Sequence, residues 1–248
     1  MSRMSEVIIP DWPAPANVKA LQTTRGGGYS QPPYDTLNFG DHVDDDPMAV
    51  AKNRQTLRLP SEPIWLEQVH GVEVVLAEQA SCRPKADATV SFHPGAVCAV
   101  MTADCLPVLL CDQAGTVVAA VHAGWRGLAD GVIEAAVNKM QVAPDTLMAW
   151  LGPAIGPQAF EVSEDVRDAF MTHDVAASSA FVPVADSAAS DIPKYLADIY
   201  LLARQRLNAL GVARIYGGGL CTYTDSKRFF SFRRDGKTGR MATLIWIA

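Results

Sequence analysis

The sequence contains no hydrophobic run long enough to cross a bilayer, and its first residues, MSRMSEVIIPDWPAP, contain no signal-peptide hydrophobic region. It also has no excess of basic residues, because 21 Lys and Arg stand against 27 Asp and Glu, for a net charge of −6. These absences predict no membrane partner and argue against a general affinity for nucleic acid. The net charge is compatible with binding of small anionic substrates, because these need only a local cluster of arginines.

Cysteine is scarce, and its spacing argues against two kinds of structural site. The chain has five cysteines, an odd number, and none of them forms a Cys-x-x-Cys pair. We therefore expect neither a disulfide framework nor a local zinc finger. We expect the protein to reside in a reducing compartment, the cytoplasm. Each isolated cysteine is first interpreted as a small buried hydrophobe.

No internal repeat, low-complexity tract or Pro/Gly/Ser-rich linker divides the chain. The stretch 175–193, VAASSAFVPVADSAASDIP, is predicted to be a surface excursion. We therefore expect one domain over residues 1–248, with enough apolar residues (49%) for one large core. Short β-branched runs beside separate helical patterns predict an α/β (α+β) fold class, with layered mixed β-sheets flanked by helices rather than a doubly wound sheet.

The pattern of apolar residues places the main elements. Asp46 followed by Pro47 predicts a helix start, with the helix running through Arg58, and further helices are predicted at 128–140 and at 191–210, the last ending at Gly211. Strands are predicted at 72–77, 97–102, 106–112, 116–123 and 241–247, with a hairpin turn at 112–115.

Three metal-capable side chains stand at the ends of apolar segments, beside glycine or another small residue. They are His70 in LEQVHG, Cys105 in MTADC and His122 in AAVHAGWRG, separated by 35 and 17 residues. Such spacing suits a site at which separate strands converge. Two imidazoles and one thiolate leave a fourth position open, which is typical of catalytic rather than structural zinc. For each residue taken alone, a packed core side chain is the commoner alternative.

Asp104 interrupts two apolar runs, where a charge is costly unless it is paired. Three roles fit this position. The carboxylate could orient a metal-bound imidazole, act as a general acid or base, or cap a neighbouring backbone N–H at the end of a strand.

Three stretches rich in glycine and arginine could bind an anion: TTRGGGYS with Arg25, AGWRGL with Arg126 and FFSFRRDGKTGR with Arg233. Glycine permits close backbone approach, and arginine offers a two-pronged donor for phosphate or carboxylate. Asn38 in NFGDH is a further candidate for the same pocket. Neither the dinucleotide-binding nor the P-loop glycine motif occurs in these stretches. The alternative for each arginine is a surface ion pair.

Taken together, LEQVHG, TADCLPVLL and VHAGWRG resemble the bacterial laccase-domain family of the YfiH type, once labelled multicopper polyphenol oxidases. The resemblance extends over nearly the whole chain through TTRGGGYS, LNFGDHVDDDP, ADATV, GPAIGP and FFSFRRDGKTGR. It implies a layered α/β fold and a zinc-dependent purine nucleoside phosphorylase with adenosine deaminase activity. The implied substrates are inorganic phosphate and adenosine, inosine, guanosine or methylthioadenosine, and the implied metal ligands are His70, Cys105 and His122.

The composition argues against the older oxidase label. A blue-copper site with a trinuclear copper cluster would need many more histidines than the five present, and His-x-His pairs are absent. Because two imidazoles and a thiolate also suit copper, copper remains the alternative to zinc.

We expect His70, Cys105 and His122 to hold the metal, Arg126 or Arg233 to contact an anion, and Asp104 to transfer a proton. The first alternative is a metal-free cysteine hydrolase, with Cys105 as nucleophile and His122 or His70 as its base. The family resemblance implies a second alternative, a hydrolase that edits peptidoglycan precursors. A non-enzymatic metal-storage module is the third.

Overall fold

The computed structural model describes residues 7–80, 82–185 and 193–248, and the strands within these ranges form three sheets. The largest sheet has six strands, in the order Arg214–Gly217 (β12), Leu147–Leu151 (β8), Leu106–Asp112 (β6), Val118–Ala123 (β7), Ala88–Ser91 (β4) and Val74–Leu76 (β3). It is a mixed sheet, because β12 runs parallel to β8 and β3 parallel to β4, whereas the other neighbours are antiparallel.

A second, antiparallel sheet joins strands from both ends of the described chain. Its order is Val7–Ile8 (β1), Val18–Thr23 (β2), Met241–Ile247 (β13) and Cys98–Thr102 (β5). The third sheet is small and consists of Phe181–Pro183 (β10), Lys194–Ala197 (β11) and Glu161–Ser163 (β9). Pairing of β2 with β13 favours one domain over residues 1–248, which stays a prediction.

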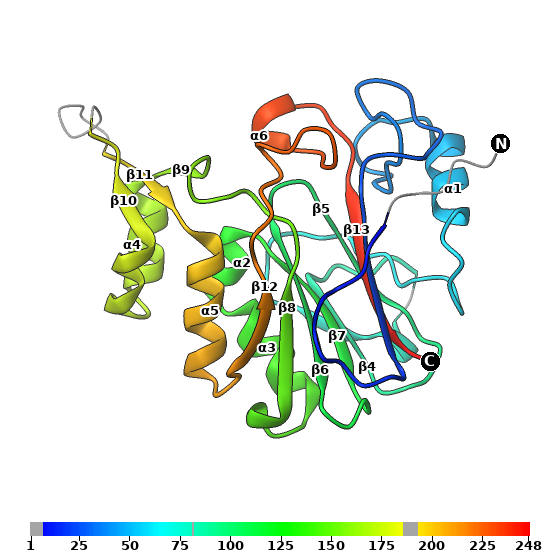
Figure 1. Cartoon of the computed structure of the whole chain (residues 1–248), viewed down its shortest axis with the longest axis horizontal. Coiled ribbons are helices and arrows are strands. Elements are labelled where there is room, and N and C mark those ends of the chain that lie inside the picture. The colour runs from blue at the N-terminus through cyan, green and yellow to red at the C-terminus, as the bar shows by residue number, and fades with distance from the viewer. Residues whose placement is uncertain (1–6, 81, 186–192) are drawn as a thin grey trace.

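The helices are Pro47–Gln55 (α1), Trp125–Asp130 (α2), Val132–Met140 (α3), Glu164–Met171 (α4), Ile199–Ala209 (α5) and Phe232–Asp235 (α6), with 3-10 turns at Ala77–Gln79 (η1), Pro144–Thr146 (η2) and Val175–Ala180 (η3). Helix α3 packs on β7 and β4, and α5 packs on α3, whereas β5 and β13 pack on β7. Figure 1 shows this arrangement, with α2, α3 and α5 on one side of the central strands and β13 and α1 on the other. No helix among the described residues is both long and apolar enough to span a membrane.

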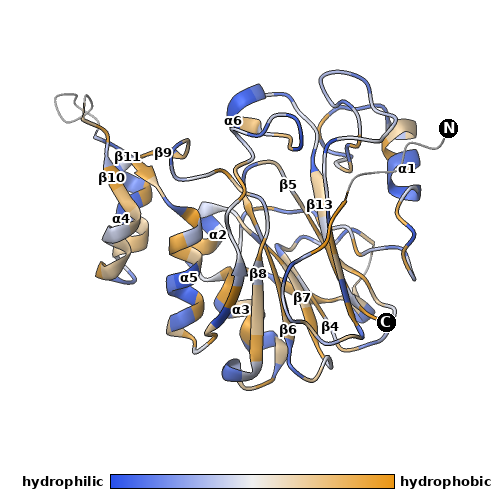
Figure 2. Cartoon of the chain, in the orientation of Figure 1, coloured by the Kyte–Doolittle hydropathy of each residue, from blue (hydrophilic) through white to orange (hydrophobic). Residues whose placement is uncertain are grey.

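Alternation of side chains explains why the central strands are apolar on both faces. In β6, Leu106, Val108 and Leu110 pack toward the helices, whereas Leu109 and Cys111 pack toward the four-stranded sheet. A strand that is covered on both faces is expected to be a nearly continuous hydrophobic run. Figure 2 shows hydrophobic colour along these strands and a mostly hydrophilic α6.

The same alternation brings polar side chains into the space between the two large sheets. Val118 and Ala120 of β7 lie in one cluster with Cys98 and Val100 of β5, so these faces meet between the sheets. Two residues further along each strand, the period of two directs His122 and Thr102 toward the same interlayer space. Both side chains are buried, at the ends of their strands.

The α+β class with layered mixed sheets is confirmed, as are strands at each of the five predicted positions, some of them shortened by one to three residues. Helix α1 begins as predicted, because the Asp46 carboxylate accepts a hydrogen bond from the Met48 N–H at 2.9 Å. It ends at Gln55, three residues before Arg58.

The prediction of one helix over 128–140 is wrong. Helix α2 already begins at Trp125, and Gly131, with a φ of 99°, separates it from α3. A left-handed residue ends a helix, and glycine adopts that conformation without steric cost. The helical period continues across the break, which is why the sequence pattern hides it.

The helix predicted at 191–210 is also shorter than expected. Residues 191 and 192, and part of the 175–193 excursion, lie outside the described residues, and Lys194–Ala197 forms β11 instead. Helix α5 begins after Asp198, whose carboxylate accepts a hydrogen bond from the Leu201 N–H at 3.0 Å. Gly211 follows the helix with a φ of 92°, in agreement with its predicted position after the end.

Candidate functional site

The structure brings together the three side chains that were singled out as metal ligands. His70 lies in the loop before β3, Cys105 in the loop between β5 and β6, and His122 near the end of β7. Their potential ligand atoms all lie within 4.8 Å of one another, and Cys105 Sγ lies 3.6 Å from His70 Nε2. The described residues contain no other group of three His, Cys, Asp or Glu side chains with this geometry.

This donor set fits a zinc ion. With Zn–S bonds of about 2.3 Å and Zn–N bonds of about 2.0 Å at a tetrahedral angle, sulfur and nitrogen lie about 3.5 Å apart. The observed separation of 3.6 Å between Cys105 Sγ and His70 Nε2 agrees with this value. The same two imidazoles and thiolate also suit copper, so the donor set does not by itself select the metal.

Two glycines of the HAGWRG stretch leave room for this convergence. A Cβ atom on Gly124 would lie 2.7 Å from Cδ2 of His70 and 3.2 Å from Sγ of Cys105. A Cβ atom on Gly127 would lie 2.7 Å from the carbonyl oxygen of Gly71. Any side chain at position 124 would therefore displace His70 and Cys105, and one at position 127 would push α2 away from the His70 loop.

A buried carboxylate, Asp87, positions both histidines. Its Oδ1 lies 2.8 Å from Nδ1 of His122, and because an ionised carboxylate only accepts, Nδ1 carries the proton and Nε2 is left for a metal. The same carboxylate accepts hydrogen bonds from the backbone N–H groups of Val69, His70 and Gly71 at 3.2, 2.9 and 2.7 Å. These bonds stabilise His70 in a left-handed conformation, with a φ of 62°.

The ionisable groups in this cluster shift one another's pKa values. Burial acts to raise the pKa of Cys105, but the charges of and hydrogen bonds from His122 and His70 outweigh it and lower the pKa to about 6. Burial acts to lower the pKa of His122, but Cys105 and Asp87 outweigh it and raise the pKa to about 9. Burial acts to raise the pKa of Asp87, and the hydrogen bonds from His122 and the Gly71 amide reverse this and lower it. The metal-free cluster is therefore a thiolate–imidazolium pair beside a carboxylate.

Asp104 lies next to Cys105 but is held by other partners. Its carboxylate accepts hydrogen bonds from the hydroxyls of Thr222 and Ser231, at 2.6 and 3.0 Å, and from the Arg233 N–H at 2.7 Å. Asp104 therefore caps a backbone N–H, which is one of the three roles considered for it from the sequence. A second role, orienting an imidazole, belongs to Asp87 instead. Proton transfer by Asp104 stays a prediction.

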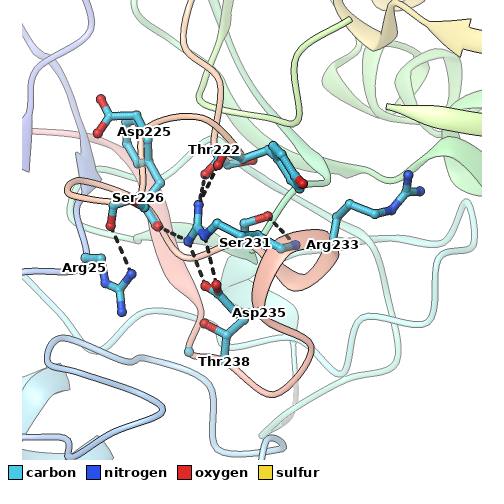
Figure 3. A network of polar contacts seen from close by, with 12 residues as sticks. Arg25, Thr222, Asp225, Ser226, Ser231, Arg233, Asp235 and Thr238 are labelled. Atoms are coloured by element: carbon cyan, nitrogen blue, oxygen red, sulfur yellow. Dashed lines mark hydrogen bonds and ion pairs between the residues drawn. The ribbon is translucent and has the colours of Figure 1, made fainter. Parts of the chain in front are cut away.

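The segment that Asp104 anchors is held by its own polar network, shown in Figure 3. Arg234 donates to the carbonyl oxygens of Thr222 and Phe229, at 2.7 and 3.0 Å, and pairs with Asp235. The hydroxyl of Ser231 accepts from the Arg234 N–H and caps α6. This network fixes α6 beside the Cys105 loop.

A cavity of about 310 Å³ opens in front of the three candidate ligands; we call it the metal cavity. It is lined by His42, Gln68, His70, Met101, Thr102, Ala103, Cys105, His122, Phe232 and Arg240. Gln68 fixes one wall, because its amide donates to the Met101 carbonyl at 2.8 Å and accepts from the Met101 N–H at 2.7 Å. Burial and the charge of Arg240 lower the pKa of His42, which favours its neutral form.

A second cavity, of about 170 Å³, adjoins the metal cavity at Cys105; we call it the aromatic cavity. It is lined by Ala103, Asp104, Cys105, Trp125, Ile155, Phe160, Ile199, Phe232 and Arg233. Ala103, Cys105 and Phe232 line both cavities. Two neighbouring spaces of different chemistry therefore meet at the candidate metal site.

Two of the three predicted anion-binding arginines lie outside the linings of these cavities. Arg25 donates to the carbonyl oxygens of Asp35 and Ser226, and Figure 3 shows the contact with Ser226. Arg126 is exposed, with its guanidinium over the Trp125 ring at 4.4 Å. Arg233 lines the aromatic cavity and donates to the Glu161 carbonyl at 2.9 Å.

The fourth predicted binding residue, Asn38, is fully buried and makes only structural contacts among the described residues. Its amide donates to the Gly40 carbonyl and the Asp45 carboxylate, and it accepts from the N–H groups of Gly40 and Arg240. From the Asn38–His42 stretch it is His42 that lines the metal cavity.

Sequence reasoning missed several residues of the site, among them Asp87, Thr102 and Arg240. Asp87 lies directly before β4 and Asp104 lies two residues before β6, so a carboxylate ahead of an apolar strand was an available signal. Arg240 is the last arginine of the stretch FFSFRRDGKTGR, in which the sequence alone does not distinguish one arginine from another.

Comparisons with known proteins agree with this geometry. The family model described as multi-copper polyphenol oxidoreductase laccase matches residues 19–248. A purine nucleoside phosphorylase of Pseudomonas aeruginosa is 56% identical over 98% of this chain and 99% of its own length. Purine nucleoside phosphorylase YfiH of Escherichia coli is 55% identical over 98% of this chain and 100% of its own. The crystal structure of a Neisseria meningitidis protein has a TM-score of 0.91 at 52% identity, covering 97% of this chain and 98% of that one.

Proposed function

The chain belongs to the multi-copper polyphenol oxidoreductase laccase family, and from this premise we propose that it is a zinc-dependent purine nucleoside phosphorylase that also deaminates adenosine. Relatives that are 55–56% identical over almost the full length carry the name purine nucleoside phosphorylase. The proposed substrates are inorganic phosphate and a purine nucleoside: adenosine, inosine, guanosine or methylthioadenosine.

One observation carries the proposal: three ligand atoms within 4.8 Å of one another lie where a polar cavity and an aromatic cavity meet. Phosphorolysis needs an anion and a flat apolar base on opposite sides of one carbon, C1′ of the ribose. A phosphate oxygen forms a bond to C1′ while the bond from C1′ to the purine nitrogen breaks and the base leaves with a proton. The two cavities provide chemically matched spaces for these two groups.

Each side of the site has residues suited to its part. Trp125, Phe160 and Phe232 can stack on a purine, which is favourable for any base because every base has a π face. His70, Cys105 and His122 would hold zinc, with Asp87 fixing the His122 imidazole and the His70 backbone. When bound by three protein ligands, zinc supplies a Lewis acid with an open position for substrate or water.

Deamination of adenosine can use the same site, because both reactions begin by binding the same nucleoside. The catalytic set that we propose is His70, Cys105 and His122, with Asp104 as the candidate for proton transfer. The Asp104 carboxylate lines the aromatic cavity while accepting its three hydrogen bonds, so it lies beside the expected position of the base.

The test is release of hypoxanthine from inosine by protein of known zinc content, with and without inorganic phosphate. We expect phosphate-dependent release that is lost in the Cys105→Ala/His122→Ala variant and on chelation, and is restored by zinc. Ammonia release from adenosine, without phosphate, measures the deaminase activity separately. Wild-type rates in the double variant would rule the proposal out.

A metal-free cysteine hydrolase is the second candidate, favoured by the lowered pKa of Cys105 beside His122. It predicts activity that survives chelation and is abolished by iodoacetamide. A nucleotide-linked muramyl-serine substrate, assayed beside inosine, tests the related peptidoglycan-editing alternative.

A further inference from the structure

We propose that Arg240 and Thr102 form the phosphate subsite of the metal cavity, in place of the arginines that the sequence indicates. The inference rests on the proposed phosphorylase function, since it assigns one of its two substrates to named residues. Both side chains line the cavity that contains His70, Cys105 and His122.

Thr102 offers a hydroxyl with no partner among the described residues. The residue is 1% exposed, and its Oγ1 is a buried polar atom without a hydrogen bond. A buried polar group without a partner is costly, so such groups are uncommon outside functional sites. Thr102 also lines the metal cavity, so we assign a ligand in that cavity as the partner of this hydroxyl.

Arg240 lines the same cavity and leaves part of its guanidinium without a hydrogen bond to any described residue. Its Nη1 donates to the carbonyl oxygens of Thr238 and Gly239, at 2.9 and 3.1 Å. Its Nε and Nη2 make no hydrogen bond to any residue that the structure describes. An arginine side chain offers these two nitrogens as a fork that matches two phosphate oxygens.

The backbone around Arg240 is built to fix this side chain. Asn38 accepts from the Arg240 N–H at 2.8 Å, and the Phe39 N–H donates to the Arg240 carbonyl at 3.0 Å. A Cβ atom on Gly40 would lie 2.9 Å from Cγ of Arg240, so glycine makes room for the arginine stem. Asn38, predicted to bind substrate, thus positions the residue that we assign to that role.

Arg240 is the one arginine or lysine among the described residues that line the metal cavity. Burial lowers the pKa of Arg240, while the negative charges of Cys105 and Asp104 act in the opposite direction. The guanidinium stays protonated at neutral pH, and no ion pair to Arg240 exists among the described residues. The other candidate, Arg233, lies in the aromatic cavity, where its Nη1 is occupied by a carbonyl oxygen.

The sharpest variant is Thr102→Val, which replaces the hydroxyl by a methyl group of similar size. Because the hydroxyl has no protein partner, we expect an unchanged or higher melting temperature and unchanged zinc content. We expect the KM for phosphate to rise about tenfold, the effect of one lost hydrogen bond to a charged group, while the KM for inosine changes less than twofold. A purely structural role would not separate the two KM values.

Arg240→Gln is expected to raise the KM for phosphate about a hundredfold, and Arg240→Lys less, because lysine keeps the charge but not the fork. Arg214→Gln, on the exposed strand β12, is the matched control and should keep the wild-type KM values. Calorimetric titration with inorganic phosphate, on zinc-loaded and zinc-free protein, gives the same comparison without turnover.

The outcomes separate this inference from the proposed function. If wild-type protein cleaves inosine with phosphate but Thr102→Val and Arg240→Gln keep its KM for phosphate within twofold, the subsite is wrong and the function stands. An equal rise in the KM for phosphate in Arg126→Gln or Arg233→Gln also overturns the assignment of the subsite to Arg240 and Thr102. If wild-type protein binds phosphate through Arg240 and Thr102 but does not cleave inosine with it, the function fails and the anion site stands.

Discussion

The metal cavity and the aromatic cavity share a wall but differ in almost every other respect. The first contains both imidazoles, Arg240 and Thr102, whose hydroxyl has no partner among the described residues. The second contains Trp125, Phe160, Ile155 and Ile199, with Asp104 and Arg233 as its charged residues. Ala103, Cys105 and Phe232 are common to both. The difference indicates that the metal cavity is suited to an anion and the aromatic cavity to a flat ring.

This division follows from where the two cavities lie in the fold. The metal cavity opens at the ends of β5 and β7, where the space between the two sheets receives Thr102 and His122. The aromatic cavity is formed by side chains from α2, α5 and α6 and by the loop before β9. Variants on each side should therefore affect different substrates, and the predictions below test this from the largest expected effect to the smallest.

Removal of a ligand that both cavities share should abolish both reactions. For Cys105→Ala we expect loss of stoichiometric zinc and a fall in kcat/KM of roughly 10³-fold or more, because a catalytic metal contributes several kcal/mol to the transition state. Metal analysis and rates with inosine and adenosine provide the measurement. Cys111→Ala, a buried cysteine of β6 outside both linings, is the control and should retain zinc.

Loss of the Asp87 charge should weaken the metal side alone. In Asp87→Asn the contact to Nδ1 of His122 and the three amide contacts change, and we expect zinc affinity to fall about 10–100-fold. Competition with a chelator of known affinity measures this. Thr222→Val, which removes one hydrogen bond to Asp104, should keep zinc affinity within twofold. Equal losses in the two variants would contradict separate roles for Asp87 and Asp104.

A smaller ring surface should weaken the aromatic side alone. For Trp125→Leu we expect the KM for inosine to rise about tenfold, the effect of losing one base–aromatic contact. The KM for phosphate and the zinc content should stay unchanged. Steady-state kinetics with each substrate varied in turn tests this, and a matched rise in both KM values would mean that the cavities do not divide the substrates.

The smallest effect concerns the thiol itself, in zinc-free protein. The pKa of Cys105 is about 6, so its rate of alkylation by iodoacetamide should stay level from pH 9 to pH 7 and then fall about twofold by pH 6. Burial raises the pKa of Cys98 and Cys111 to about 12, so these two should not react in the folded protein. Peptide mass spectrometry follows each cysteine, and zinc should protect Cys105. A rate that climbs steadily from pH 7 to pH 9 would contradict the lowered pKa.

The sequence was sufficient to predict five of the strands, β3, β5, β6, β7 and β13, and to single out the three metal-capable residues, because both depend on local chemistry. His122 and Cys105 are metal-capable side chains in otherwise apolar, buried runs. A residue that departs from its surroundings in this way often belongs to a functional site. The period of two along β5 and β7 then determines which side chains face the interlayer space.

What the sequence could not provide depends on contacts between distant segments. Arg25, Arg126, Arg233 and Arg240 are alike in their local sequence, and only the packing of residues 38–40 on Arg240 sets it apart. The break at Gly131 was hidden because helical periodicity continues across it. Lys194–Ala197 has a pattern that fits a helix, but pairing with β9 and β10 makes it a strand.

The position of β13 also has a consequence for the order in which this protein can fold. Strand β13 lies between β2 and β5, and Thr243 Oγ1 bonds the side chain of Gln22, 221 residues earlier. Arg240, directly before β13, therefore reaches its place only after a contact of very high sequence separation has formed, and such topologies fold slowly. During synthesis on the ribosome, His70, Cys105 and His122 emerge more than 100 residues before Arg240. A nascent chain can thus gather its three proposed metal ligands early, whereas Arg240 reaches its place only when β13 closes the sheet.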